Sequence, residues 1–156
     1  MYAIGIDVGG SRIRVAAIDD AGRIHDFHRH PTPWRESPGR FVQFLARWAA
    51  KARLNNYPTN AVGIGLAVPG ILDHVGGIVV RAVNLPHLEG FPLAARLAQA
   101  TSLPVKLLSD ADAATWGEFR GQSSSPRWIS NQGSTNSIQP STLSDLHSFV
   151  HLRLGT

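Results

Sequence analysis

Residues 4–15 read Ile4-Gly5-Ile6-Asp7-Val8-Gly9-Gly10-Ser11-Arg12-Ile13-Arg14-Val15, two strand-like runs joined by an acidic, glycine-rich turn. The glycines at positions 9 and 10 permit backbone dihedrals that a Cβ would forbid, so amide N–H groups can approach an anion closely. Ser11 adds a hydroxyl donor beside them. The Asp7 carboxylate would repel a bare phosphate, so its presence makes sense only if a divalent cation, Mg²⁺ with retained waters, lies between the two. The stretch therefore predicts that Asp7, Gly9, Gly10 and Ser11 bind a metal nucleotide.

The same dozen residues also fit an ordinary β-hairpin with a Gly-Gly turn, because such turns are common and Asp is a frequent turn residue. Two other nucleotide motifs can be set aside. No Gly-Lys-Ser or Gly-Lys-Thr follows a glycine loop, which removes the Walker-type P-loop. The segment 63–70, Gly-Ile-Gly-Leu-Ala-Val-Pro-Gly, superficially resembles a dinucleotide fingerprint, but its third glycine is misplaced and Pro69 interrupts the required helix start.

The composition is that of a globular protein: the chain has 156 residues, of which 43% are hydrophobic, and its formal net charge is +4. The basic residues are scattered without forming a run, which argues against nucleic-acid binding. The chain has no cysteine, so it can build neither disulfides nor thiolate zinc sites, and its seven histidines show no metal-ligand spacing. We therefore expect no zinc site and no nucleic-acid partner.

The N-terminus reaches Asp7 almost at once, which leaves no room for the apolar core of a signal peptide. No apolar stretch approaches the roughly 20 residues that are needed to span a bilayer. Together with the lack of cysteine, these features predict a cytoplasmic protein that has no membrane partner.

Three strands are expected at the start of the chain, at residues 3–8, 12–18 and 23–29. The sequence Asp19-Asp20-Ala21-Gly22 separates the last two and is a strong hairpin signal, so the three strands should form an antiparallel meander.

A helix is expected over residues 38–54, because Ser37-Pro38 resembles an N-cap followed by proline at the first helical position and apolar residues then recur at helical spacing. Residues 61–68 read as a continuous apolar strand of the kind that follows a crossover helix. The remaining expected elements are a Gly76-Gly77 turn, a helix over 91–100, a strand over 103–108, and a helix from just past Asp110 through Glu118. The predicted order is therefore β-β-β-α-β-α-β-α.

A second chemical site is predicted where strand 103–108 meets the following helix. Open α/β sheets collect their ligands at such junctions. Phosphorylation of an alcohol needs a carboxylate that accepts the hydroxyl proton as the bond to phosphorus develops, and Asp110 is the best candidate for this base. The alternative is that Ser109 or Asp110 is only a helix N-cap, and we assign Asp112 mainly to helix-start electrostatics.

Several motifs follow one another along the chain: Ile4 to Val15, Gly63 to Gly70, Asn84-Leu85-Pro86 with Glu89-Gly90-Phe91-Pro92-Leu93, Leu103-Pro104-Val105, and Asp110 to Ala114 with Gly117-Glu118. Together they resemble the ROK family (repressor, open reading frame, kinase) in order and spacing, over about residues 2–121. The resemblance implies an α/β fold, in which residues 1–121 form the N-terminal lobe of an actin-like (ribonuclease H-like) ATPase. This lobe would have a mixed sheet of about five strands with flanking helices.

The resemblance also implies an ATP-dependent sugar kinase that acts on a hydroxyl of a hexose or N-acetylhexosamine, with Asp110 as the base. The implied site residues are Asp7, Gly9, Gly10 and Ser11 for ATP, with Mg²⁺ held by Asp7 through water, and Gly70, Asn84, Ser109 and Asp110 for the sugar. Two positions depart from the family pattern. Thr is usual where Ser11 stands, which keeps the hydroxyl, and Asn is usual where Ser109 stands, which does not keep the amide.

Residues 123–145, within the tail 122–156, do not match the family pattern and are longer than the connection expected there. Ser, Asn, Gln, Thr and Pro dominate from Ser123 to Leu143 and periodicity largely disappears, so we expect a polar, disordered tail. An inserted or out-of-frame segment is our hypothesis for this change of composition. Gly155-Thr156 looks like the opening of the second phosphate loop that family members possess.

We therefore expect an N-terminal portion of a sugar kinase, inactive without a C-terminal lobe. Two alternatives stay open: a sugar-binding regulator of the repressor type found in the same family, and a non-catalytic remnant. The phosphate motif starts at residue 4, which leaves no room upstream for a DNA-binding domain and disfavours the repressor. The sequence does not identify the sugar, and it leaves open whether a full-length form is a homo-oligomer.

Overall fold

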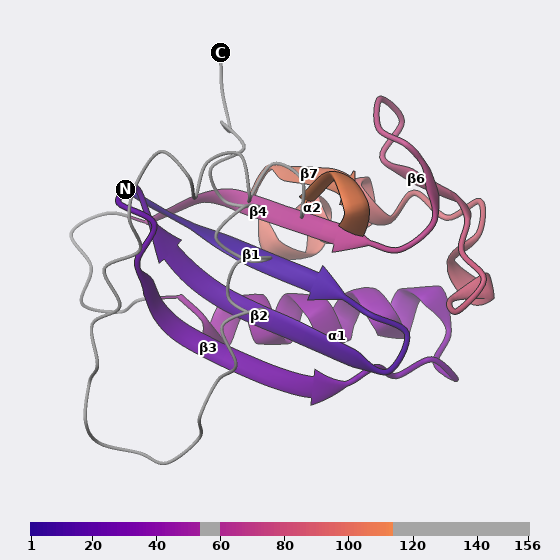
Figure 1. The fold of residues 1–156 in the computed structure, drawn as a ribbon, viewed down its shortest axis with the longest axis horizontal. Coiled ribbons are helices and arrows are strands. Elements are labelled where there is room, and N and C mark those ends of the chain that lie inside the picture. Colours follow the sequence, from indigo (N-terminus) through magenta and orange to yellow (C-terminus); the bar gives the residue numbers. More distant parts are fainter. Residues whose placement is uncertain (54–59, 114–156) are drawn as a thin grey trace.

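The computed structural model describes residues 1–53 and 60–113 (Figure 1). Its main sheet has five strands in the order β3-β2-β1-β4-β7. These strands are β1 (Tyr2–Val8), β2 (Arg12–Asp19), β3 (Ile24–Pro31), β4 (Ala61–Val68) and β7 (Val105–Ser109). The first three pair antiparallel as a meander, whereas β4 runs parallel to β1 and β7 runs parallel to β4. The predicted mixed sheet of about five strands is confirmed.

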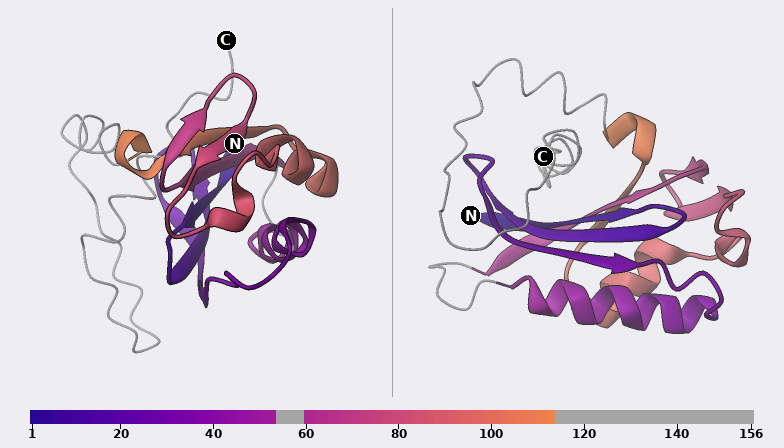
Figure 2. Two further views of the ribbon diagram at one scale, coloured as in Figure 1. Left: turned by 90° about the vertical axis from the view of Figure 1, so that its right-hand side faces the viewer. Right: turned by 60° about the horizontal axis from the view of Figure 1, so that its bottom comes forward.

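Two helices, α1 (Pro38–Lys51) and α2 (Leu93–Thr101), lie on the same face of the main sheet (Figure 2). The first begins where the sequence predicts, because the Ser37 hydroxyl accepts the Arg40 N–H at 3.5 Å and a proline occupies the first turn. Leu45 and the other apolar side chains of its inner face are buried. None of the helices in the described part of the chain is long and apolar enough to cross a membrane.

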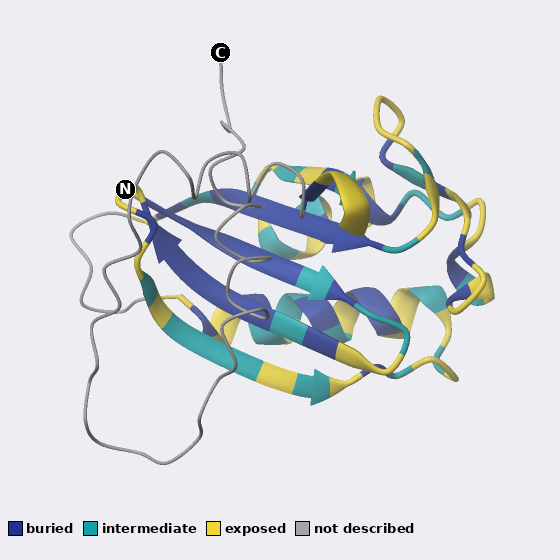
Figure 3. Cartoon of the chain, in the orientation of Figure 1, coloured by how far each residue is buried: buried dark blue, intermediate teal, exposed yellow. Residues whose placement is uncertain are grey.

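The hydrophobic core lies between the main sheet and these two helices. In β1 the side chains of Ile4, Ile6 and Val8 are fully buried in it, and Figure 3 shows β1 and β4 buried over most of their length. Side chains alternate along a strand, so Asp7 lies on the opposite face of the sheet. A shift of one residue would bury Asp7 among the helices, so the core fixes the direction in which its side chain points.

Two short strands, β5 (Ile71–Asp73) and β6 (Ile78–Arg81), form a separate antiparallel hairpin. The sequence predicted only a glycine-rich connection here, so the predicted order of elements is wrong in this segment. The predicted turn itself is present. Gly77 has a φ of +65°, and its carbonyl accepts the Ala94 N–H at 3.2 Å, which ties the hairpin to α2. A short 3-10 turn, η1 (Pro86–Leu88), follows the hairpin.

The other predicted elements differ from the structure only at their ends. The helix expected over 91–100 is α2, and the strand expected over 103–108 is β7; both begin about two residues later than predicted. The helix expected after this strand begins at Asp110, and only its first turn is described. Its predicted end at Glu118 lies outside the described residues, as does the predicted tail at 122–156.

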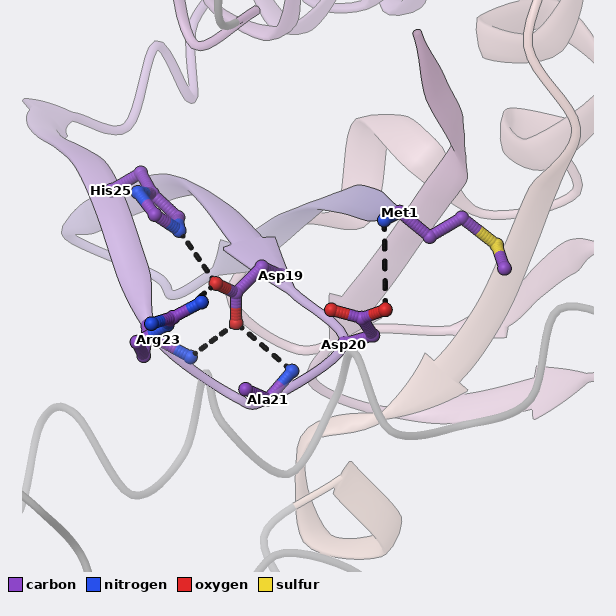
Figure 4. A network of polar contacts seen from close by, with 6 residues as sticks. All are labelled: Met1, Asp19, Asp20, Ala21, Arg23 and His25. Atoms are coloured by element: carbon purple, nitrogen blue, oxygen red, sulfur yellow. Dashed lines mark hydrogen bonds and ion pairs between the residues drawn. The ribbon is translucent and has the colours of Figure 1, made fainter. Parts of the chain in front are cut away.

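The turn between β2 and β3 is organised by one buried carboxylate, that of Asp19 (Figure 4). Its Oδ1 accepts the N–H groups of Ala21 and Arg23 at 3.0 and 2.9 Å. Its Oδ2 accepts the Arg23 Nε–H at 2.8 Å and lies 2.8 Å from His25 Nε2. The predicted hairpin is thus confirmed, and a single side chain accepts two of the N–H groups of its turn.

Candidate functional site

The carboxyl ends of β1, β4 and β7 lie along one edge of the main sheet, because these three strands are parallel. The register aligns Asp7 with Ala67, and Ala67 with Leu108. Neighbouring strands are roughly 4.8 Å apart, so the Cα atoms of Asp7 and Leu108 lie about 10 Å apart, and Asp110 follows two residues later. Figure 2 shows the helical turn that begins at Asp110 on the side opposite α1 and α2, which is also the side that Asp7 faces. The structure thus brings Asp7 and the helical turn that begins at Asp110 to the same end of the parallel strands and the same face of the sheet.

The turn between β1 and β2 is a tight loop with Gly10 and Ser11 at its tip. The Gly9 N–H donates to the Arg12 carbonyl at 2.8 Å, and a Cβ at position 9 would lie 2.9 Å from the same oxygen. Only glycine allows this approach. Because the Gly9 N–H is engaged, the N–H groups left for an anion are those of Gly10 and Ser11, neither of which donates to another described residue. The exposed Ser11 hydroxyl lies beside them.

One buried residue at the end of β3 holds this turn in place. Thr32, which is 5% exposed, donates its hydroxyl to the Gly9 carbonyl at 2.6 Å and its N–H to the Ser11 carbonyl at 3.0 Å. Sequence reasoning missed Thr32, because it lies 23 residues from Gly9 and no local pattern links them. Its neighbours Pro31 and Pro33 indicate only an extended connection.

The Asp7 carboxylate forms an ion pair with the Arg14 guanidinium. The register places the two residues opposite each other, and their side chains are mostly buried, with 16% of Asp7 and 24% of Arg14 exposed. Sequence reasoning did not find this pair, although the register of a two-residue hairpin turn would have given it. Arg14 Nε is buried and has no acceptor among the described residues, so the guanidinium keeps an unused donor close to the turn.

Asp7 is suited to contribute a carboxylate oxygen to a Mg²⁺ ion that arrives with a nucleotide. Within residues 1–53 and 60–113, no group of three or more His, Cys, Asp or Glu side chains could hold a metal ion by itself. Mg²⁺ usually keeps several waters and is bound by one or two carboxylates together with substrate phosphates. A single carboxylate next to a turn with free N–H groups fits that manner of binding.

Asn84 lies directly against the turn. A Cβ placed at Gly10 would be 3.0 Å from Asn84 Cβ and 3.3 Å from its side-chain nitrogen. The loop that carries Asn84 is closed by the bond from the Leu85 N–H to the Ala82 carbonyl, and Glu89 Oε1 accepts the Ala82 N–H; both bonds measure 3.0 Å. The structure therefore brings a residue predicted to contact sugar next to one predicted to bind phosphate.

Gly70 follows β4 by two residues, close to the same edge of the sheet. Its φ is +130°, and a Cβ there would lie 2.2 Å from the Arg81 carbonyl oxygen. Glycine is thus required because the chain passes close to the end of β6. A direct contact between Gly70 and a sugar stays a prediction.

Ser109, and not Asp110, caps the helix that follows β7. The Ser109 hydroxyl accepts the Asp112 N–H at 3.0 Å, which is the usual N-cap bond. The Asp110 side chain accepts only the N–H of the next residue, Ala111, at 2.9 Å among the bonds seen, and Asp110 is exposed. Because Ser109 supplies the N-cap bond, the exposed Asp110 carboxylate is left accessible for proton transfer. The Asp112 carboxylate is directed to a different segment, because its Oδ2 lies 3.8 Å from His74 Nε2.

Comparison with known proteins agrees with this arrangement. The model of the ROK family matches residues 3–127, which is most of the chain. The chain belongs to the ROK family. Its main sheet has the order and strand directions of the actin-like, ribonuclease H-like fold, and ROK sugar kinases share that fold. The fold prediction is therefore confirmed.

Three relatives illustrate what this ROK chain is similar to. It is 32% identical over 127 residues to the N-acetylmannosamine kinase of Citrobacter koseri, covering 81% of this chain and 42% of that protein. It is 34% identical over 121 residues to the glucokinase of Halalkalibacterium halodurans, covering 76% of this chain and 36% of that protein. A crystal structure of the ROK family glucokinase from Streptomyces griseus, with glucose and AMPPNP, matches with a TM-score of 0.68. That match is 29% identical and covers 77% of this chain and 36% of the glucokinase.

This ROK chain thus spans about two fifths of the length of the curated relatives it matches. The structure brings six of the predicted site residues to the carboxyl edge of the sheet or into the turn there: Asp7, Gly9, Gly10, Ser11, Ser109 and Asp110. Asn84 joins them through its contact with the turn, and Gly70 follows the neighbouring strand. The roles of these residues toward ATP, Mg²⁺ and sugar stay predictions.

Proposed function

We propose that this ROK chain carries the phosphate-binding turn and the base of an ATP-dependent sugar kinase. The observation that carries the proposal is that the strand register and the helical turn after β7 put Asp7 and Asp110 at the same end of the parallel strands. The similar proteins named N-acetylmannosamine kinase and glucokinase support a hexose or N-acetylhexosamine as the acceptor. The AMPPNP in the matching glucokinase structure supports ATP as the donor.

The proposed site has a donor side, which binds the nucleotide, and an acceptor side, which binds the sugar. On the donor side, the N–H groups of Gly10 and Ser11 bind the terminal phosphate oxygens. Mg²⁺, when bound near Asp7, neutralises phosphate charge during the transfer. On the acceptor side, Asp110 accepts the proton of a sugar hydroxyl while that oxygen forms a bond to the terminal phosphorus and the bond from phosphorus to ADP breaks. Asn84 and Ser109 lie near enough to this edge to orient the sugar.

Phosphoryl transfer requires the protein to surround the donor and the acceptor from both sides, because aligning the two supplies most of the catalysis. The described residues would surround the ligands from one side only, and the relatives are more than twice as long as the segment that matches this chain. We therefore expect these 156 residues to bind ligands by themselves, but to turn over little unless they are combined with a region like the part of the relatives that lies outside the match.

Calorimetric titration of the full chain with Mg-ATP tests the donor side. We expect binding that Asp7→Asn weakens about tenfold or more, because one charged contact is worth roughly 1.5–3 kcal/mol. Asp20→Asn is the matched control, since Asp20 is an exposed carboxylate that pairs with the N-terminal amine at 3.6 Å. It should bind Mg-ATP as the wild type does.

Titration with glucose and N-acetylmannosamine, and an assay of sugar-dependent ADP release, test the acceptor side. We expect sugar binding and little ADP release from the chain alone. Sugar binding without any Mg-ATP binding would instead favour a non-catalytic sugar-binding protein. Substantial ADP release from the chain alone would contradict the need for a further region. If Asp110→Asn abolished this release and Asp112→Asn preserved it, Asp110 would be confirmed as the base.

A further inference from the structure

The turn between β1 and β2 is held at two carbonyl oxygens by the same residue, Thr32. Its hydroxyl bonds the Gly9 carbonyl at 2.6 Å and its N–H bonds the Ser11 carbonyl at 3.0 Å. The Thr32 carbonyl in turn accepts the Trp34 N–H at 2.9 Å, so all polar groups of this buried residue are engaged. The two carbonyls flank Gly10, the residue at the tip of the turn.

Peptide geometry connects these bonds to the N–H groups that face an anion. A trans peptide is planar, so the carbonyl of Gly9 and the N–H of Gly10 point in opposite directions. When the Thr32 hydroxyl fixes the Gly9 carbonyl, it also fixes the Gly10 N–H, which then points away from Thr32. Without such a bond, two adjacent glycines sample many orientations, and ordering them on binding costs affinity.

We propose that Thr32 is a positioning residue for phosphate binding: its hydroxyl presets the Gly9-Gly10 peptide so that the Gly10 N–H meets the terminal phosphate of the nucleotide. This inference rests on the proposed function, because it assigns the turn to a nucleotide. Threonine suits the task, since its methyl group fills the buried position while its hydroxyl supplies a donor.

Two substitutions of Thr32 and one control test the proposal on the full chain. Thr32→Val keeps the shape but removes the donor, and Thr32→Ser keeps the donor. Thr101→Val is the matched control, because the Thr101 hydroxyl also donates to a backbone carbonyl, that of Leu97 at 2.8 Å in α2. Each variant is titrated with Mg-ATP and, separately, with glucose, and its stability is measured by urea unfolding.

We expect Thr32→Val to weaken Mg-ATP binding about tenfold, since the Gly9 carbonyl loses its hydrogen bond and the freed peptide must be ordered on binding. Thr32→Ser should bind Mg-ATP nearly as the wild type does, and in Thr32→Val the affinity for glucose should fall by a smaller factor than the affinity for Mg-ATP. Thr101→Val should lose stability without losing Mg-ATP affinity.

The outcomes separate this inference from the proposed function. If the wild type binds Mg-ATP and Thr32→Val binds it equally well, the role of Thr32 is overturned while the proposed function stands. If Thr101→Val weakened Mg-ATP binding as much as Thr32→Val did, Thr32 would be a structural residue only. The positioning role would also be overturned if Thr32→Ser bound Mg-ATP as weakly as Thr32→Val. A wild type that binds no Mg-ATP overturns both.

Discussion

At the scale of single residues, Asp19 shows how one side chain can stabilise a connection far from the site. Burial by itself would raise the pKa of Asp19. The hydrogen bonds from His25 and from the N–H and side chain of Arg23, together with the charge of Arg23, outweigh burial and lower the pKa to about 2. The charged form is therefore the one that the folded protein stabilises.

This lowered pKa predicts a loss of stability in acid. A carboxyl whose folded pKa lies below its unfolded value of 3.8 stabilises the fold fully above about pH 4, and this contribution disappears as the pH falls toward about 2. The shift corresponds to about 2 kcal/mol. Asp19→Asn should therefore lower the free energy of unfolding by about 2 kcal/mol at pH 7 and by much less near pH 2, as measured by urea unfolding.

Asp20→Asn is the control for this prediction, because the Asp20 side chain is exposed and pairs with the N-terminal amine at 3.6 Å. It should leave stability nearly unchanged at both pH values. A difference between Asp19→Asn and the wild type that stayed constant from pH 7 to pH 2 would show that shape, and not charge, is what the turn needs.

At the scale of elements, the structure shows which parts of the fold local sequence could predict. The strand over 61–68 and the start of α1 were predictable, because a continuous apolar run and a Ser-Pro cap are local signals. The β5-β6 hairpin was not, because β5 has only three residues and its first one, Ile71, is exposed. Asp7 and Asp110 were predictable from their places at strand ends, whereas Thr32 depends on a contact between distant segments.

The connection from β4 to the hairpin predicts a second stability effect. Gly70→Ala should lower the free energy of unfolding by about 2–4 kcal/mol, because a Cβ would meet the Arg81 carbonyl at 2.2 Å and the backbone must shift. Gly90→Ala is the matched control: Gly90 also has a positive φ, +72°, but its Cβ would meet nothing within 4 Å. It should cost only about 1 kcal/mol.

Thermal or urea unfolding of the two variants distinguishes steric contact from backbone strain. If both variants lost the same stability, the positive φ alone would explain the glycine at position 70. The steric contact with the Arg81 carbonyl would then add nothing to the loss in the free energy of unfolding.

At the scale of the whole molecule, the contact between Gly10 and Asn84 joins the residue proposed to bind phosphate to a residue proposed to bind sugar. The two residues are far apart in the sequence, and only the folded chain brings the turn after β1 against the loop after β6. A ligand that orders one of these loops therefore reduces the cost of ordering the other.

This contact predicts positive coupling between the two ligands of the proposed function. Glucose or N-acetylmannosamine, at saturation, should raise the affinity for Mg-ATP by about fivefold or more, and Mg-ATP should raise the sugar affinity by the same factor. Calorimetric titrations in both orders measure the two factors. Identical affinities with and without the second ligand would show that the two loops are ordered independently.

The pairing of the sheet also decides which of the two site strands, β1 or β7, is displaced more easily. β1 has a neighbour on each edge, whereas β7 is paired along one edge only in the part of the chain that the structure describes. Displacing β1, which ends near Asp7, would break two ladders of backbone bonds, whereas displacing β7, which ends near Asp110, would break one. Thermal motion should therefore displace the end of β7, with Asp110, more than the end of β1, with Asp7.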